Sequence, residues 1–167
     1  MADQALDEAP ACSLPAAPDR GVCIRPFEPA DVPAAQAFIV QGMRPHLYPL
    51  ALAPDRVQWV LQQFAQPHPD RLALIALRGD SVVGGLSALV APMLWFERCE
   101  AHVLMCRAVV PGVGRRLLRA LLDWVNADLR IRRVVWPQEF DADPRISLLA
   151  ARLGFAHRMP MCVYYKG

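Results

Sequence analysis

The chain has little net charge, no long apolar run and a single lysine. Its formal net charge is +2 at pH 7 and it has no basic stripe with interleaved aromatic residues, so we expect no nucleic-acid partner. No apolar run approaches the roughly 20 residues that span a bilayer, and the acidic first twenty residues do not resemble a signal peptide. We therefore expect a cytoplasmic protein with no membrane association. Arginine in place of almost every lysine, with many alanines, is typical of a GC-rich, bacterial genome.

Cysteine and histidine spacing gives no sign of a metal centre. The five cysteines are scattered, no Cys-x-x-Cys pair occurs, and the four histidines lie far apart. We therefore expect no bound metal.

Length and composition favour one folded domain. The 167 residues are 54% hydrophobic and 20% charged, which is enough apolar chain for a substantial core. Residues 1–20, rich in alanine, proline and aspartate, predict a disordered leader, and residues 21–167 predict a single domain.

Apolar periodicity predicts alternating strands and helices. Asp31 is expected to cap a helix that begins near Val32, and a tight turn at Arg78–Ser81 is expected to join two strands as a hairpin. Strands are expected at 22–25, on both sides of that turn within 71–90, and at 99–110, 132–137 and 161–166; helices are expected from 32 onward and at 54–66, 115–129 and 144–153. This order predicts an α/β (α+β) fold with a mixed sheet and helices on both faces.

Three stretches, in this order, resemble the GCN5-related N-acetyltransferase (GNAT) superfamily over nearly all of residues 22–166. They are IRPFEPADVPAAQAF, GDSVVGGLSAL, and HVLMCRAVVPGVGRRLLRALLDWV followed by LLAARLGF. The resemblance implies a mixed, largely antiparallel central sheet and an N-acetyltransferase that uses acetyl-CoA.

The same resemblance implies a binding site for the pyrophosphate of CoA at the turn after the fourth strand. It would consist of Ala108, Val109, Val110, Gly112, Val113, Gly114, Arg115 and Arg116. Glycines allow the backbone to approach an anion closely, and the first N–H groups of a helix are unpaired donors at its positive end. Two arginines at a helix start are unfavourable unless an anion is near. The loop is shorter than in the family and has Val109 at its usual Arg/Gln position; the alternative is a plain tight turn.

His102 is the expected catalytic base, because imidazole titrates near pH 7. Strand alternation predicts that Glu100, His102, Leu104 and Cys106 share one face, so Glu100 is a second candidate, acting through water. In the resemblance, His102 falls where some family members have a glutamate base. The alternative is that His102 is a hydrogen-bonded sheet residue. In the family a tyrosine is the usual general acid, and this sequence has Ala150 at that position, which cannot donate a proton.

The resemblance also implies an acceptor cleft that is lined by the segment between the first two helices and by the last strands. That predicts a lining of Met43, His46, Tyr48, Leu50, Trp136, Glu139 and Phe140. We expect a small-molecule or peptide amine as acceptor, small or hydrophobic and not a polycation. A homodimer is left open.

The predicted function is therefore an acyl-CoA-dependent N-acetyltransferase. The alternative is a catalytically impaired GNAT-fold binding or assembly protein, phage- or prophage-associated, which the short loop and Ala150 favour. A third possibility is a nucleotide-binding α/β protein that uses Gly112 and Gly114, but its hairpin is antiparallel and the motif Gly-x-Gly-x-x-Gly is incomplete.

Overall fold

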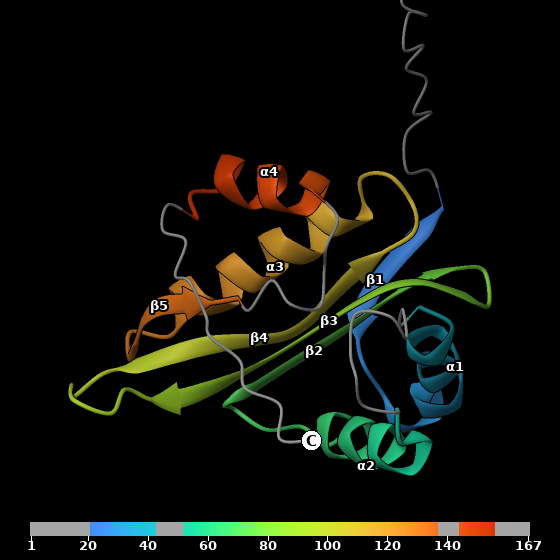
Figure 1. Cartoon of the computed structure of the whole chain (residues 1–167), viewed down its shortest axis with the longest axis horizontal. Coiled ribbons are helices and arrows are strands. Elements are labelled where there is room, and N and C mark those ends of the chain that lie inside the picture. Colours follow the sequence, from blue (N-terminus) through green and yellow to red (C-terminus); the bar gives the residue numbers. More distant parts are fainter. Residues whose placement is uncertain (1–20, 43–51, 137–143, 156–167) are drawn as a thin grey trace, which may run out of the picture.

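The computed structural model describes residues 21–42, 52–136 and 144–155 (Figure 1). Its elements are β1 (Val22–Pro26), η1 (Pro29–Asp31), α1 (Val32–Gly42), α2 (Pro54–Phe64), β2 (Arg71–Arg78), β3 (Ser81–Pro92), β4 (Cys99–Ala108), α3 (Val113–Ala127), β5 (Ile131–Val135) and α4 (Pro144–Arg152). They follow the predicted order of strands and helices. The predicted leader and the predicted strand at 161–166 lie outside the described residues.

The five strands form one sheet in the order β1-β2-β3-β4-β5. All neighbours are antiparallel except β4 and β5, which are parallel and joined by α3, as a parallel pair requires a crossover connection. The predicted hairpin is confirmed: Gly79, at φ +57°, lies in the tight turn between β2 and β3. The predicted mixed, largely antiparallel sheet is confirmed as well.

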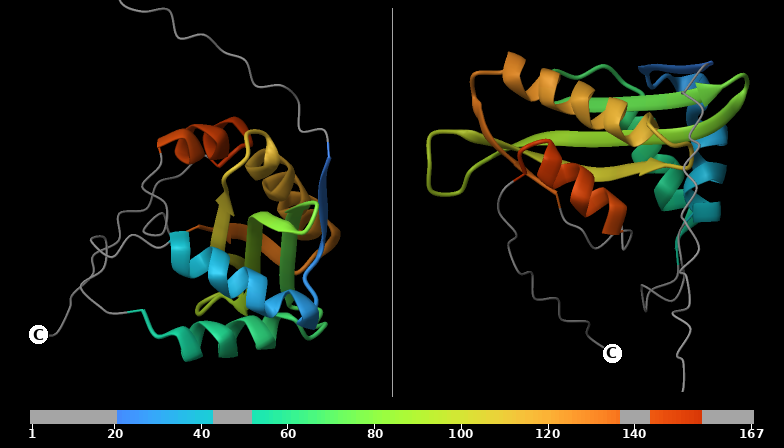
Figure 2. Two further views of the ribbon diagram at one scale, coloured as in Figure 1. Left: turned by 90° about the vertical axis from the view of Figure 1, so that its right-hand side faces the viewer. Right: turned by 90° about the horizontal axis from the view of Figure 1, so that it is seen from above.

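Helices cover both faces of the sheet, as predicted (Figures 1 and 2). Helix α3 packs on β2 to β5 and α4 packs on α3, whereas α1 packs on β3 and α2 on β2. We call the two sides of the sheet the α3 face and the α1 face.

The main hydrophobic core lies between α3 and the sheet. Leu117, Leu118 and Leu121, which recur at helical spacing, are fully buried. They pack with Val103 and Cys106 of β4 and with residues of β1, β2 and β3. This core fixes α3, and therefore its first turn, against the end of β4.

Helix α1 begins at Val32, as predicted, but Asp31 does not cap it. Asp31 ends the 3-10 turn η1, and its carboxylate accepts hydrogen bonds at 2.7 Å from both terminal nitrogens of Arg25 on β1 and at 2.9 Å from the Glu28 backbone N–H. The predicted helix cap is therefore wrong. A bidentate guanidinium is a stronger partner than a single amide, so Asp31 ties the start of α1 to β1. The hydrogen bond from Arg25 lowers the pKa of Asp31, and this outweighs the opposing effect of burial.

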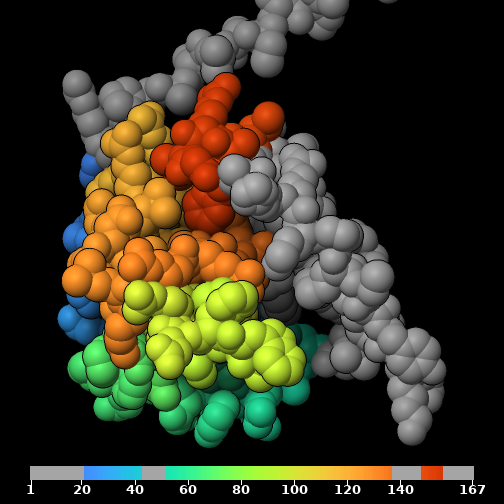
Figure 3. Space-filling model, turned by 90° about the vertical axis from the view of Figure 1, so that its left-hand side faces the viewer, coloured from blue at the N-terminus to red at the C-terminus, as the bar shows by residue number. Residues whose placement is uncertain are grey.

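The β3–β4 hairpin extends beyond the helices and ends in exposed apolar residues. Leu94, Trp95 and Phe96 are 83, 83 and 66% exposed. In Figure 3 this tip (yellow-green) lies beside the residues that precede β5 (orange). The two segments are joined by a hydrogen bond from the Cys99 N–H to the Arg130 carbonyl, at 2.9 Å. Among the described helices, none has the length and apolar character needed to cross a membrane.

Candidate active site

The predicted phosphate-binding turn lies at the start of α3. Strand β4 ends at Ala108, four residues follow, and α3 begins at Val113 with Gly112 before it at φ +87°. This backbone conformation is costly for any residue with a side chain. Helix α3 thus begins two residues earlier than predicted, and Gly112 makes the turn between the end of β4 and the helix.

Some backbone N–H groups of the predicted turn form hydrogen bonds within the protein, and others do not. The N–H groups of Val109, Val113 and Arg116 bond to the carbonyls of Val83, Val110 and Gly112. By contrast, the N–H groups of Gly114 and Arg115 have no hydrogen-bond acceptor among the described residues. These two N–H groups are therefore available donors at the helix start.

The two arginines at this helix start have different surroundings. The guanidinium of Arg116 donates to the Val22 carbonyl of β1 at 3.1 Å, so this side chain has a partner within the fold, and its role at a phosphate site stays a prediction. Arg115 is exposed, and the first turn of α3 contains no acidic residue. Positive charge at a helix start is destabilising, so Arg115 fits the anion-binding interpretation.

His102 and Glu100 lie on β4 and contact one another directly. The Nε2 atom of His102 is 2.8 Å from Oε1 of Glu100, and Oε2 of Glu100 accepts a hydrogen bond from Nε of Arg133 on β5. The register of the parallel pair places Arg133 opposite Glu100. Hydrogen bonds thus join three side chains in the order Arg133, Glu100, His102, and the side chain of His102 is one third exposed.

The charge state of Glu100 determines which nitrogen of His102 is free. Burial raises the pKa of Glu100, but hydrogen bonds from Arg133 and His102 outweigh it and hold that pKa below its usual value. An ionised carboxylate only accepts hydrogen bonds, so Nε2 of His102 carries the proton. Nδ1, which has no hydrogen-bond partner among the described residues, is then the basic nitrogen.

A β-bulge in β4 corrects the predicted face of Cys106. Ser87 of β3 pairs with Met105, whereas Ala88 pairs with Val103, so Leu104 is an extra residue in β4. Glu100, His102 and Leu104 share the α1 face as predicted. Beyond the bulge the alternation reverses, and Cys106 is buried in the core on the α3 face.

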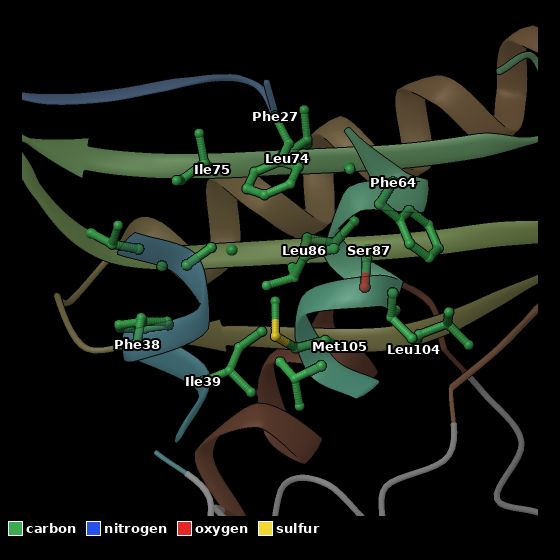
Figure 4. A pocket seen from close by; sticks show the side chains of 18 of the residues that line it. Phe27, Phe38, Ile39, Phe64, Leu74, Ile75, Leu86, Ser87, Leu104 and Met105 are labelled. Atoms are coloured by element: carbon green, nitrogen blue, oxygen red, sulfur yellow. The ribbon is translucent and has the colours of Figure 1, made fainter. Parts of the chain in front are cut away.

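The α1 face of the sheet and helices α1 and α2 enclose a cavity of about 460 Å³ (Figure 4). From α2 it is lined by Val57, Val60, Leu61 and Phe64, which the sequence placed on one apolar face. The bulge residues Leu104 and Met105 form its β4 wall. Nothing in the periodicity of α2 distinguished a cavity from a packed core, so this site was missed.

The structure describes some of the other residues named from the sequence and not the rest. Ala150 lies on α4 and is 4% exposed, so a larger side chain there has no room without repacking. Trp136 contacts the Phe155 ring edge-on, with centroids 6.0 Å apart. The remaining expected acceptor-lining residues, Met43, His46, Tyr48, Leu50, Glu139 and Phe140, lie outside the described residues. Arg133 was missed, because its only signal would have been knowledge of the strand pairing.

No family model and no curated protein sequence matches this chain. Its fold, however, matches many solved structures. Glucosamine-6-phosphate N-acetyltransferase from Arabidopsis thaliana is 10% identical, with a TM-score of 0.65 over 86% of this chain and 97% of that one. AAC(6')-Iy, solved with the bisubstrate analogue CoA-S-monomethyl-acetylneamine, is 16% identical, with a TM-score of 0.63 over 87% and 98%.

A third similar structure is an acetyltransferase of the GNAT family from Streptococcus pneumoniae, 16% identical, with a TM-score of 0.60 over 80% of this chain and 83% of that one. At such identities the similarity concerns the fold. The chain has the fold of the GNAT acetyltransferases, which confirms the resemblance at that level. A doubly wound nucleotide-binding protein is wrong, because that fold needs a mostly parallel sheet.

Proposed function

We propose that this chain is an N-acetyltransferase that transfers the acetyl group of acetyl-CoA to the amine of a small, apolar acceptor. The observation that carries the proposal is the start of α3. In a GNAT fold, this helix follows β4 after a four-residue turn and has two unengaged N–H groups, a left-handed glycine before it and no acidic residue in its first turn.

These residues fit the pyrophosphate of CoA. The N–H groups of Gly114 and Arg115 would donate to phosphate oxygens, and the positive end of the helix would stabilise the negative charge. The exposed guanidinium of Arg115 would add a charge-assisted contact. When bound, acetyl-CoA would supply the acetyl group as a reactive thioester.

His102 would act as the base. An amine must lose its proton to be nucleophilic, and Nδ1 of His102 is the nitrogen free to accept that proton. Glu100 would hold the imidazole in this tautomer, and Arg133 would hold Glu100. Both are positioning residues, since each acts through His102.

Turnover is expected to be slow for a chemistry of this kind. Ala150 offers no proton donor at the position where the family has a tyrosine, and loss of general acid catalysis typically costs about 10²- to 10⁴-fold. The product thiolate would then take its proton from water or from the reacting amine.

The test is calorimetric titration with acetyl-CoA and with desulfo-CoA, followed by an assay of CoA thiol release with a panel of small primary amines. We expect both CoA compounds to bind and at least one apolar amine to accelerate thiol release. No binding at millimolar ligand would refute the cofactor assignment. Binding without acetyl transfer to any amine would refute the enzyme and leave a binding protein.

A further inference from the structure

We propose that the cavity between the α1 face of the sheet and helices α1 and α2 binds the hydrocarbon or aromatic body of a monoamine, and that it rejects polyamines. The proposal deepens the function above by naming the class of acceptor, and the role of the ligand as acceptor rests on that function. The binding of an apolar ligand in the cavity does not.

The size and lining of the cavity mark it as a ligand site. Protein interiors are close-packed, and ligand pockets usually enclose about 300–1,000 Å³; this one encloses about 460 Å³. Helix α2 turns its apolar residues toward the sheet, yet none of its residues is fully buried. The apolar faces of α2 and the sheet therefore stand apart, whereas α3, on the other face, packs tightly.

The charge inside the cavity argues for a single amine. Among the described residues that line it, the only charged side chain is that of Arg56, which lies over the Trp59 ring with its Cζ 4.7 Å from the ring centroid. No carboxylate of the described residues lines the cavity. A second ammonium carried into it would lose its hydration, gain no counter-ion and meet a guanidinium, and an unpaired buried charge is strongly unfavourable.

One polar group is placed to orient a ligand. The hydroxyl of Ser87 projects into the cavity from β3 (Figure 4) and has no hydrogen-bond partner among the described residues. Ser87 pairs with Met105 at the bulge of β4. His102 lies on the same face of β4, two residues before Leu104. An amine at this end of the cavity is therefore directed toward the His102 base.

The first experiment compares amines that differ only in length and charge. With acetyl-CoA saturating, KM is measured for n-alkylamines from butylamine to decylamine, for 1,8-diaminooctane and for spermidine. Each added methylene should lower KM about fourfold, from about 0.8 kcal/mol per buried CH₂, until the cavity is filled. The diamine should have a KM at least tenfold above that of octylamine. Diamine or spermidine KM values equal to or below that of octylamine would overturn the proposal.

The second experiment needs no acetyl transfer. Binding of 1-octanol and octylamine is measured by calorimetry for the wild type and for Ser87→Phe, which fills the cavity. The matched control is Ser81→Phe, the same substitution at an exposed position of β3. We expect Ser87→Phe to weaken both ligands at least tenfold and Ser81→Phe to leave them unchanged. Ala73→Leu, on the paired strand, fills the cavity less and serves if Ser87→Phe does not fold.

The two experiments separate the two hypotheses. If 1-octanol binds and the cavity-filling variants prevent it while no amine is acetylated, the enzyme function fails and the cavity assignment stands. If spermidine is acetylated and neither 1-octanol nor octylamine binds, the acetyltransferase activity stands, whereas the apolar acceptor and the cavity assignment both fail. Equal ligand affinities in the wild type and in a folded cavity-filling variant would also overturn the assignment.

Discussion

Glu100 and His102, two residues apart on β4, are joined by a 2.8 Å contact between Oε1 and Nε2, and the other carboxylate oxygen of Glu100 is held by Arg133 of β5. Glu100 and His102 meet because strand alternation puts both side chains on the α1 face. Arg133 reaches Glu100 because β5 runs parallel beside β4 and pairs these two residues. It leaves Nδ1 of His102 as the basic nitrogen of the site.

A first prediction concerns this base. Replacement of His102 by alanine should lower kcat/KM, because the reacting amine then loses the group that accepts its proton. The remaining rate should be lower by about 10²- to 10⁴-fold, the usual contribution of a positioned base. The measurement is a pH–rate profile with octylamine. A variant as fast as the wild type would show that the base is another residue.

A second prediction separates positioning from catalysis. Arg133→Met removes the hydrogen bond that lowers the pKa of Glu100, so this pKa should rise toward its ordinary value. The rate should then fall about tenfold, with kcat changing more than KM, because a carboxylate that Arg133 no longer orients holds the tautomer of His102 less well. Arg132→Met, an exposed neighbour on β5, is the control and should have no effect. Identical pH–rate profiles for the two variants would contradict the role.

A third prediction concerns the start of α3. Gly112→Ala places a side chain at φ +87° and should weaken CoA binding about 5- to 150-fold, the equivalent of 1–3 kcal/mol of lost hydrogen bonds. Gly79→Ala carries comparable strain in the β2–β3 turn and should leave CoA affinity unchanged. Calorimetry with acetyl-CoA measures both.

The neighbouring glycine gives a sharper contrast. A Cβ at Gly114 would lie 3.7 Å from the Cβ of Ala108 and 3.9 Å from Leu149 Cδ2, which is ordinary van der Waals contact within the fold. Gly114→Ala should therefore bind CoA as the wild type does. Loss of CoA binding in this variant would mean that the phosphate approaches from the side of Ala108.

A fourth prediction concerns stability at low pH. Asp31→Asn should lower the free energy of unfolding at pH 7 by about 2 kcal/mol, since hydrogen bonds to charged groups contribute about 1.5–3 kcal/mol. The folded pKa of Asp31 lies below its ordinary value of about 3.9, so its stabilisation is complete above that pH and is lost as pH falls through the folded pKa. The difference from wild type in urea denaturation should therefore shrink below about pH 4. Asp128→Asn, in an exposed ion pair with Arg130, should have a much smaller effect.

A fifth prediction follows from the burial of Ala150. Restoring the family's tyrosine by Ala150→Tyr should not raise the rate, because the position is 4% exposed and has no room for a ring. Overpacking should instead lower the free energy of unfolding by about 1–3 kcal/mol. Ala151→Tyr, at the exposed next position of α4, should be nearly neutral in thermal denaturation. A faster, stable Ala150→Tyr enzyme would show that the cleft opens to this side chain.

Local patterns in the sequence were sufficient to predict the described helices and strands and their order. Helical spacing identified the buried leucines of α3 and the apolar face of α2, and the residues around Gly79 identified the hairpin turn. The pair of Gly112 and Gly114 marked the start of α3. Each of these signals depends on backbone geometry that repeats over a few residues, so it can be read without knowing the fold.

Contacts between distant segments were decided by the tertiary structure. Strand alternation assumes a regular strand, and only the register with β3 shows that Leu104 is an extra residue and that Cys106 turns to the other face. In the same way, Arg116 reaches Val22, Arg133 reaches Glu100, and α2 stands away from the sheet to leave the cavity. Spacing along the chain carries no information about such partners, because they meet only when the core brings β1, β5 and the helices to the sheet.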